Sequence, residues 1–251
     1  MDNRVALDKE FSTQSFVEEQ PYEEMLDKYK EMACNYSQME NVIAVLSDLR
    51  TNTSYIHYGS FSQMLGIDEY RKENKVCSIW EEEIFKLIHP DDLASKHLHE
   101  LCFFHFIKRQ PKKKRKDYYL TSKLRMKSDT NSYINVLHRI FYISAPFNDT
   151  LWLAMCLYSP LVFDIPSKYL IVNSSNGQIT ELDQQNNAKI LSAREKQVLH
   201  LINQGYPSKE IAEMLSISIN TVSRHPQEIL GKLQVKNSIE ACRIGKDLKL
   251  I

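Results

Sequence analysis

The chain has 251 residues, of which 43% are hydrophobic and 25% are charged, and its 32 Lys and Arg balance 32 Asp and Glu. This composition excludes a disordered, collagen-like or disulfide-rich chain, and the length allows two modest domains with separate cores. The longest apolar runs, 101–107 and 151–158, fall far short of the roughly 20 residues of a membrane span, and the charged residues 1–10 lack the apolar core of a signal peptide, so we expect a cytoplasmic protein without a membrane partner.

Residues 1–40 are predicted to form an N-terminal helical segment, with a helix over 13–40. Apolar side chains recur along this helix at steps of three and four residues. They are Tyr22, Met25, Tyr29, Met32, Tyr36 and Met39. This stripe packs either on the rest of its own domain or on a second copy of the chain. It lasts fewer than three heptads, so it predicts at most a weak coiled coil by itself, and both interpretations stay open.

Residues 41–160 are predicted to form one domain that combines strands and helices. The pattern predicts strands at 42–48 and 53–58, short helices at 61–65 and 84–88, a long helix at about 93–108, and strands at 118–126, 133–144 and 151–159. His89-Pro90-Asp91-Asp92 precedes the long helix, where proline needs no N–H and the aspartates oppose the positive end of the helix dipole. This order and motif resemble a PAS sensor domain, which implies a five-stranded antiparallel sheet around a cavity for a small-molecule ligand.

A strongly basic stretch follows the long helix. Seven of the nine residues from Lys108 to Lys116 are Lys or Arg. We predict a solvated, flexible loop, and contact with DNA or with an acidic partner is the alternative.

Cofactor chemistry and catalysis are not predicted. His97, His99 and His105 lie on the long helix, where some PAS domains bind haem, but core or surface histidines explain them more simply. The Asn-Cys-Arg-Phe type of flavin motif is missing around Cys102. The five cysteines lack metal-binding spacing, which predicts reduced thiols. No Gly-rich phosphate loop, His-Glu-x-x-His or nucleophile motif is present, so an enzyme is the least expected class.

Residues 161–190 are predicted to be a hairpin and a linker. Two short strands, 168–172 and 178–182, flank a Ser-Asn-Gly turn, and the polar residues 183–187 carry no pattern. The charge then changes sign. Residues 191–251 carry nine Lys and Arg against six Asp and Glu, a net of +3, whereas residues 1–190 carry 23 against 26, a net of −3. A mildly basic C-terminal domain is the direction expected of a module that binds phosphates.

Residues 191–251 carry the pattern of four helices. Ser192 and Glu195 form a capping box that opens the first, and Gly205 is placed to end it in a left-handed conformation. The second is predicted at 208–215. Ser218 can cap the third, whose inner face holds Val222, Ile229 and Leu233. The fourth spans about 238–248. Two short helices joined by such a tight turn are typical of a helix-turn-helix, whose second helix enters the major groove.

This stretch resembles the LuxR-type DNA-binding domain over its whole length. The shared pattern is S-x-R-E at 192–195, V-L at 198–199, G-x-x-x-K-E-I-A at 205–212, S-x-x-T-V at 218–222, K-L at 232–233 and E-A at 240–241. The resemblance implies a bacterial transcription regulator that binds double-stranded DNA as a homodimer, with the dimer contact on the fourth helix. The predicted fold class is therefore α+β: a PAS-like five-stranded antiparallel sheet with helices, then an all-α four-helix domain.

The resemblance also implies roles for individual residues. Those expected to read base edges are Ser223, Arg224 and Gln227. Those expected to hold phosphates are Lys209, Ser218, Asn220, Thr221, Lys232, Lys236 and Asn237. Core or hinge positions are expected at Ile211, Val222 and His225, and contacts that tie the helices together are expected from Arg194 and Glu195.

Two prolines depart from the family pattern. Pro207 stands where a Ser or Thr usually caps the second helix, so we expect Ser208 to take that role one residue late. Pro226 lacks the N–H that would bond the Val222 carbonyl, which costs about 3 kcal/mol or more, so we expect a kinked or shortened third helix and weaker DNA binding. The alternatives are therefore a signalling protein that acts through protein contacts and a helix-turn-helix that binds RNA polymerase.

Overall fold

The computed structural model describes residues 3–67, 73–182, 191–233, 235, 237–247 and 250–251. The chain divides into two compact units, one formed by Leu7–Glu181 and the other by Leu182–Ile251 together with Met1–Ala6. The predicted linker 183–187 lies outside the described residues. Within the described part, no helix has both the length and the apolar character needed to cross a membrane.

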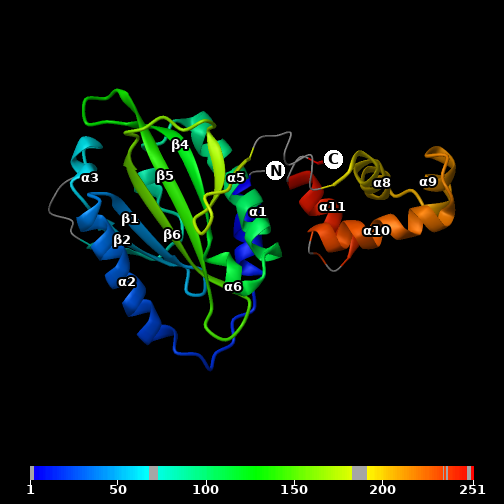
Figure 1. Ribbon diagram of the computed structural model, residues 1–251, viewed down its shortest axis with the longest axis horizontal. Coiled ribbons are helices and arrows are strands. Elements are labelled where there is room, and N and C mark those ends of the chain that lie inside the picture. Colours follow the sequence, from blue (N-terminus) through cyan, green and yellow to red (C-terminus); the bar gives the residue numbers. More distant parts are fainter. Residues whose placement is uncertain (1–2, 68–72, 183–190, 234, 236, 248–249) are drawn as a thin grey trace. The chain divides into compact units, whose positions relative to one another are not determined.

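One antiparallel sheet forms the framework of the Leu7–Glu181 unit (Figure 1). Its strands are β1 (Ile43–Asp48), β2 (Thr53–Tyr58), β3 (Glu73–Val76), β4 (Tyr118–Lys127), β5 (Tyr133–Ser144), β6 (Leu151–Pro160), β7 (Tyr169–Asn173) and β8 (Ile179–Glu181). Their spatial order is β3-β2-β1-β6-β5-β4-β7-β8, and every neighbouring pair is antiparallel.

The prediction of five strands was wrong, because the sheet has eight. The hairpin assigned to the linker segment is present, but β7 pairs with the free edge of β4, from Tyr118 with Asn173 to Ser122 with Tyr169. At the other end, β3 pairs with β2. An unpaired edge strand leaves a row of backbone donors and acceptors, so both additions satisfy groups that five strands would have left open.

Six helices are described between Asn3 and Arg115. They are α1 (Asn3–Ser12), α2 (Tyr22–Met39), α3 (Phe61–Met64), α4 (Glu82–Phe85), α5 (Pro90–Arg109) and α6 (Lys112–Arg115). The helix predicted over 13–40 begins only at Tyr22, after Pro21. α1 lies inside the predicted N-terminal helical segment 1–40, but it was not predicted as a separate helix. Proline disfavours helical geometry in the residue before it, which explains the late start of α2.

Helices cover both faces of the sheet, with α2 on one side and α5 on the other (Figure 1). Along β6, Met155 and Leu157 belong to the core that includes α2, whereas Ala154 and Cys156 line a small cavity with residues of α5. Because both faces are covered, β6 is buried almost from end to end instead of alternating.

The apolar stripe of α2 divides into two halves. Tyr22 is buried and Tyr29 packs against the same core, next to the Trp152 ring. Met32, Tyr36 and Met39 remain exposed in the second half of the helix. The intramolecular interpretation therefore holds for the first half, and the second half keeps an apolar surface.

The acidic pair that opens α5 has two different roles. Asp91 is exposed, and its backbone N–H donates to His89 Nδ1 at 3.3 Å. Asp92 is 1% exposed and accepts hydrogen bonds from Arg125 Nη2 at 2.8 Å and Lys168 Nζ at 2.5 Å. Burial acts to raise the pKa of Asp92, but these hydrogen bonds outweigh burial and hold it well below its usual value. Asp92 thus ties α5 to β4 and to the start of β7.

The basic stretch from Lys108 to Lys116 is not the flexible loop that was predicted. It contains the end of α5 and the single turn α6. Arg115 is buried, and its guanidinium donates to the carbonyls of Lys108, Gln110 and Asp149 at 3.1, 3.1 and 2.5 Å. A charged group that bonds three carbonyls orders the segment around it.

The three histidines of α5 are buried residues with separate ring neighbours. His97 lies edge-on to Trp80, His99 stacks on Tyr169 at 3.6 Å between ring centroids, and His105 packs beside Phe104. These contacts agree with the interpretation of the three histidines as core residues.

Candidate DNA-binding surface

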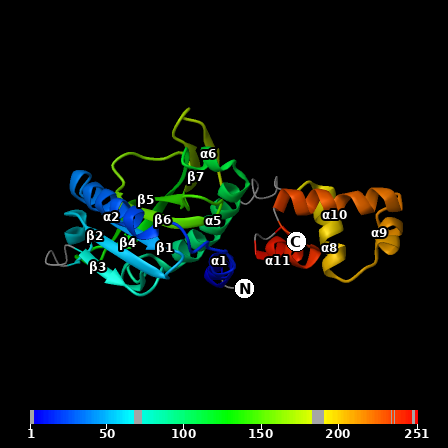
Figure 2. The same cartoon turned by 90° about the horizontal axis from the view of Figure 1, so that it is seen from below.

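Four helices are described between Ala193 and Asp247 in the C-terminal unit (Figure 2). They are α8 (Ala193–Asn203), α9 (Ser208–Met214), α10 (Ile219–Leu233) and α11 (Ser238–Asp247). The predicted capping box is confirmed, because Ser192 Oγ accepts from Glu195 N at 3.3 Å while Glu195 Oε2 accepts from Ser192 N at 2.7 Å. The left-handed end of the first helix is also confirmed, with φ of +89° at Gly205.

The helices enclose a core made from one face of each. Its buried members are Val198, Leu199, Leu201, Ile211, Ala212, Val222, Ile229, Leu233, Ala241, Cys242 and Ile244. Ile202 and Leu215 are only partly buried. The core positions predicted for Ile211 and Val222 are confirmed, and His225 is largely buried beside them.

A tight turn aims α10 away from α9. Ser216 adopts a left-handed conformation with φ of +53°, and Ser218 Oγ then accepts from Thr221 N at 3.1 Å. The predicted cap of the third helix is therefore confirmed. It satisfies one of the backbone donors that every helix start leaves without an intrahelical partner.

The three residues predicted to read bases lie on the exposed side of α10. Ser223, Arg224 and Gln227 are all exposed, whereas Val222 and Ile229 are buried on the opposite side. Arg224 Nε donates to Glu228 Oε1 at 2.8 Å, one turn further along the helix. The guanidinium thus lies along α10 and has a carboxylate partner that a base would have to replace.

Most residues predicted to hold phosphates are exposed as well. The exposed ones are Lys209, Ser218, Asn220, Thr221, Lys232 and Asn237. Asn237 Oδ1 also accepts from Glu240 N at 2.9 Å and so caps α11. Lys236 lies outside the described residues.

Lys232 has a structural partner that the sequence analysis did not anticipate. Its ammonium lies 2.7 Å from Oε2 of Glu195, which is buried. Burial acts to raise the pKa of Glu195, but hydrogen bonds from Lys232 and Ser192 outweigh it and lower the pKa. Arg194 Nη2 donates to the Leu215 carbonyl. Arg194 and Glu195 therefore tie the helices together, as predicted, and Lys232 takes part in the same contact.

The cap predicted for Ser208 and the shortened helix predicted at Pro226 need correction, whereas a kink at Pro226 and weaker DNA binding stay predictions. Pro207 is the residue before α9 and makes no side-chain cap, and Ser208 lies inside the helix as its first residue, so it does not replace the missing cap. Pro226 lies within α10, which runs without interruption from Ile219 to Leu233, so the helix is not shortened. Val222 lies before the proline and Ile229 after it in the core, and this packing outweighs the lost hydrogen bond.

The comparisons with known sequences concern this unit. Residues 189–244 match the model of the bacterial regulatory proteins of the luxR family. The oxygen regulatory protein NreC of Staphylococcus aureus is 44% identical over 63 residues, which are 25% of this chain and 29% of that protein. The chain thus spans less than a third of the length of the curated relative that it matches. Residues 189–244 are a LuxR-type helix-turn-helix domain.

Solved structures show only distant likenesses. The phage VqmA–DPO complex is 12% identical with a TM-score of 0.32, over 89% of this chain and 91% of that one. The PAS-B domain of Drosophila melanogaster Cycle with bound ethylene glycol is 12% identical with a TM-score of 0.30, over 47% and 97%. Escherichia coli SdiA is 14% identical with a TM-score of 0.26, over 99% and 97%. At these scores the likenesses carry no conclusion about this chain.

Proposed function

Because residues 189–244 form a LuxR-type domain, we propose that this chain is a transcription regulator that binds double-stranded DNA as a homodimer. The observation that carries this proposal is the division of α10 into two sides. Val222, Ile229 and Leu233 anchor one side in the core, and the polar side remains open to solvent. A helix held in this way can enter the major groove without exposing its apolar residues.

In the proposed complex, Ser223, Arg224 and Gln227 contact base edges. Arginine pairs best with guanine and glutamine with adenine, so these two positions carry most of the sequence preference. Phosphate contacts come from Lys209, Ser218, Asn220, Thr221, Lys232, Lys236 and Asn237. The Lys232 ammonium would keep Glu195 as a partner in this arrangement. Such contacts set the register on the duplex without reading sequence.

We assign the dimer contact to α11. Ile239 is 85% exposed there, whereas Ala241, Cys242 and Ile244 of the same helix are buried. The assignment rests on the resemblance to LuxR-type domains, in which the fourth helix commonly makes the dimer contact, and Ile239 is the apolar residue of α11 that a second copy would cover. Two-fold symmetry would place the half-sites about 10 bp apart.

The N-terminal unit is proposed to be a PAS-like domain that senses a signal, with a small-molecule ligand as one candidate, or mediates dimerisation. The antiparallel sheet and the long helix after His89-Pro90-Asp91-Asp92 support the PAS-like assignment. The exposed Met32, Tyr36 and Met39 on α2 support a contact with a second copy. A change in this contact would alter how the two DNA-reading helices meet their half-sites.

The second candidate function is action through protein contacts, including contact with RNA polymerase. Two observations favour it: Arg224 is paired with Glu228, and Pro226 replaces a residue whose N–H would support α10. Co-purification with core polymerase in the absence of DNA, together with no preference for any DNA sequence, would support this candidate over the first.

The test of DNA binding begins by selecting ligands for the full chain from a pool of random duplexes. Binding of the selected duplex is then measured by fluorescence anisotropy at two salt concentrations. Arg224→Ala should weaken binding by about 1–3 kcal/mol, roughly 5- to 150-fold, and relax the preference at one base pair. The charge-matched control Lys196→Ala, on α8, should change affinity by less than about threefold. A pool that yields no preferred sequence would contradict the proposal.

A further inference from the structure

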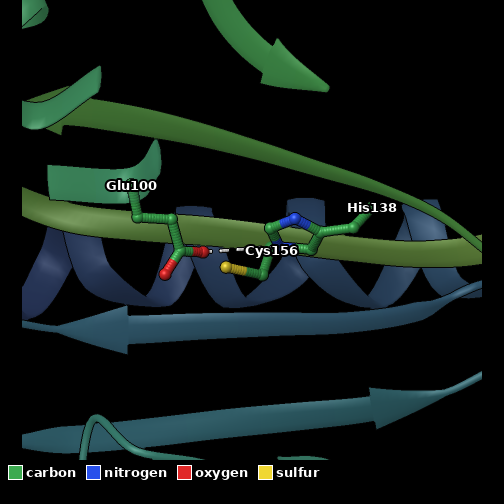
Figure 3. A group of neighbouring side chains, drawn as sticks. All are labelled: Glu100, His138 and Cys156. Carbon is green, nitrogen blue, oxygen red and sulfur yellow. Dashed lines mark ion pairs between the residues drawn. The ribbon is translucent and has the colours of Figure 1, made fainter. Parts of the chain in front are cut away.

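Three side chains with metal-binding atoms meet inside the N-terminal unit. Glu100 comes from α5, His138 from β5 and Cys156 from β6, and their donor atoms all lie within 4.8 Å of one another. Figure 3 shows the carboxylate, the imidazole and the thiol converging between the helix and the sheet. All three residues are buried, and His138 is fully inaccessible.

The histidine of this group lacks the hydrogen bonds that a buried imidazole normally makes. Among the residues that the structure describes, neither Nδ1 nor Nε2 of His138 has a hydrogen-bond partner. Glu100 Oε1 lies 3.8 Å from Nε2, which is too far for a hydrogen bond. A buried polar group left without a partner costs about 1–3 kcal/mol, so native proteins rarely keep one without a reason.

The space beside the group decides what kind of ligand fits. Glu100 and Cys156 line an internal cavity of about 30 Å³, together with Glu81 and Lys96. This volume holds a water molecule, which needs roughly 10–15 Å³, but it is far too small for an organic molecule. The geometry therefore favours a single ion that carries a bound water.

We propose that Glu100, His138 and Cys156 bind a divalent transition-metal ion of the Zn²⁺ class. Carboxylate oxygen, imidazole nitrogen and thiolate sulfur are the three protein ligands that Zn²⁺ takes, and its usual coordination number of four leaves one position for a water in the cavity. Binding forms three metal–ligand bonds and releases the thiol proton of Cys156 to solvent. The ion would join α5 to two central strands of the sheet.

Lys96 competes with the ion for this site. Its ammonium lies 2.7 Å from Glu100 Oε1, and both side chains are buried. An incoming ion must displace the ammonium from Glu100. The displaced ammonium can still pair with Glu81, which lines the same cavity. Lys96→Met should therefore tighten metal binding, because it removes a positive charge beside the ion.

The test uses the full chain without an affinity tag, freed of metal and then titrated with Co²⁺. We expect one tightly bound Co²⁺ per chain, a thiolate-to-cobalt charge-transfer band in the near ultraviolet, and displacement by Zn²⁺. Cys156→Ser should abolish the band, whereas Cys102→Ser, which removes another buried cysteine of the same unit, should leave it unchanged. Absence of tight binding, or a band that persists in Cys156→Ser, would overturn the proposal.

A second measurement needs no variant and so does not depend on how Cys156→Ser folds. X-ray absorption of the zinc-loaded wild-type chain should show one sulfur at about 2.3 Å and nitrogen or oxygen ligands at about 2.0–2.2 Å. The structure also brings Glu195, His225 and Glu228 together in the C-terminal unit, but that group contains no cysteine. A zinc shell without sulfur would therefore overturn the assignment to the Glu100 site.

Discussion

The two units of this chain place their polar side chains in opposite ways. In the N-terminal unit, Asp92, Glu100 and His138 are buried between the helices and the sheet. In the C-terminal unit, most polar residues of α10 point to solvent, with His225 as an exception, and Glu195 is the buried acid among the residues described there. The comparison teaches that charge ties elements together inside the first unit, whereas most charged side chains of the second unit stay on its surface, where the proposed function uses them.

This difference has an energetic consequence. Removing one partner of a buried ion pair leaves a charge without compensation, which typically costs 3–5 kcal/mol. An exposed ion pair such as Arg224 with Glu228 contributes only about 0–1 kcal/mol, because water and salt screen it. Substitutions of charged residues should therefore act on stability in the N-terminal unit and on binding in the C-terminal unit.

The largest effect is expected from Asp92→Ala. This change removes the acceptor of three hydrogen bonds from Arg125, one of them from its backbone N–H, and of one from Lys168. It should lower the free energy of unfolding by about 3 kcal/mol. Both tryptophans of the chain, Trp80 and Trp152, belong to this unit, so their fluorescence during urea unfolding reports its stability alone.

The neighbouring Asp91 provides the matched control. It is exposed, and its carboxylate lies 3.7 Å from His89 Nδ1 and 3.8 Å from Arg125 Nη2. Asp91→Ala should therefore change the free energy of unfolding by less than about 1 kcal/mol. If Asp91→Ala and Asp92→Ala lowered the free energy of unfolding equally, the burial of Asp92 would not explain its contribution to stability.

The low pKa of the buried Asp92 carboxylate predicts that the N-terminal unit loses stability in acid. Its folded pKa lies below the value of about 3.9 expected in the unfolded chain, so the unfolded state takes up the proton first as the pH falls. The stabilisation from Asp92 is thus fully present well above pH 4 and is lost progressively below it. Unfolding monitored by tryptophan fluorescence should show a flatter pH dependence in Asp92→Asn than in the wild-type chain below pH 4.

A smaller effect, and one of opposite sign, is expected from Pro226→Ala, which should increase the stability of the C-terminal unit. Because α10 keeps its helical course through Pro226, alanine should restore the hydrogen bond to the Val222 carbonyl and stabilise the unit by about 2–3 kcal/mol. Hydrogen exchange of the α10 amides measures this gain. Pro207→Ala is the control, since Pro207 precedes α9 and removes no intrahelical bond. Unchanged exchange in Pro226→Ala would mean that the helix already accommodates the proline.

The sequence predicted the C-terminal unit well because its information is local. The capping box at Ser192, the left-handed Gly205 and the cap at Ser218 depend on residues within a few positions of one another. Helical periodicity then identified the buried side of α10. The pairing of Lys232 with Glu195 spans 37 positions and was missed, because no local pattern encodes it.

The N-terminal unit was predicted less completely for the same physical reason. Most of its strands were placed correctly, but the attachment of β7 to β4 joins segments about 50 residues apart and depends on tertiary pairing. The Glu100, His138 and Cys156 group was also missed. One local signal was available: Lys96 and Glu100 lie four positions apart on a helix that also carries a run of apolar residues.

The smallest predicted effect tests whether charge on α10 acts on recognition alone. Glu228→Gln removes the carboxylate that holds Arg224 and takes a negative charge away from the surface proposed to face DNA. Freeing the guanidinium should strengthen binding to the selected duplex by about 0.5–1 kcal/mol, roughly two- to fivefold, with little change in stability. Glu213→Gln, which removes an exposed carboxylate from α9, controls for the change in net charge. If both variants strengthen binding equally, the gain comes from net charge, whereas a gain confined to Glu228→Gln identifies Arg224 as the side chain that is released. In that case the Arg224–Glu228 ion pair of the wild-type chain must open before Arg224 can contact DNA. An exposed ion pair opens at a small cost in free energy, whereas the buried ion pairs of the N-terminal unit could open only at a much larger one.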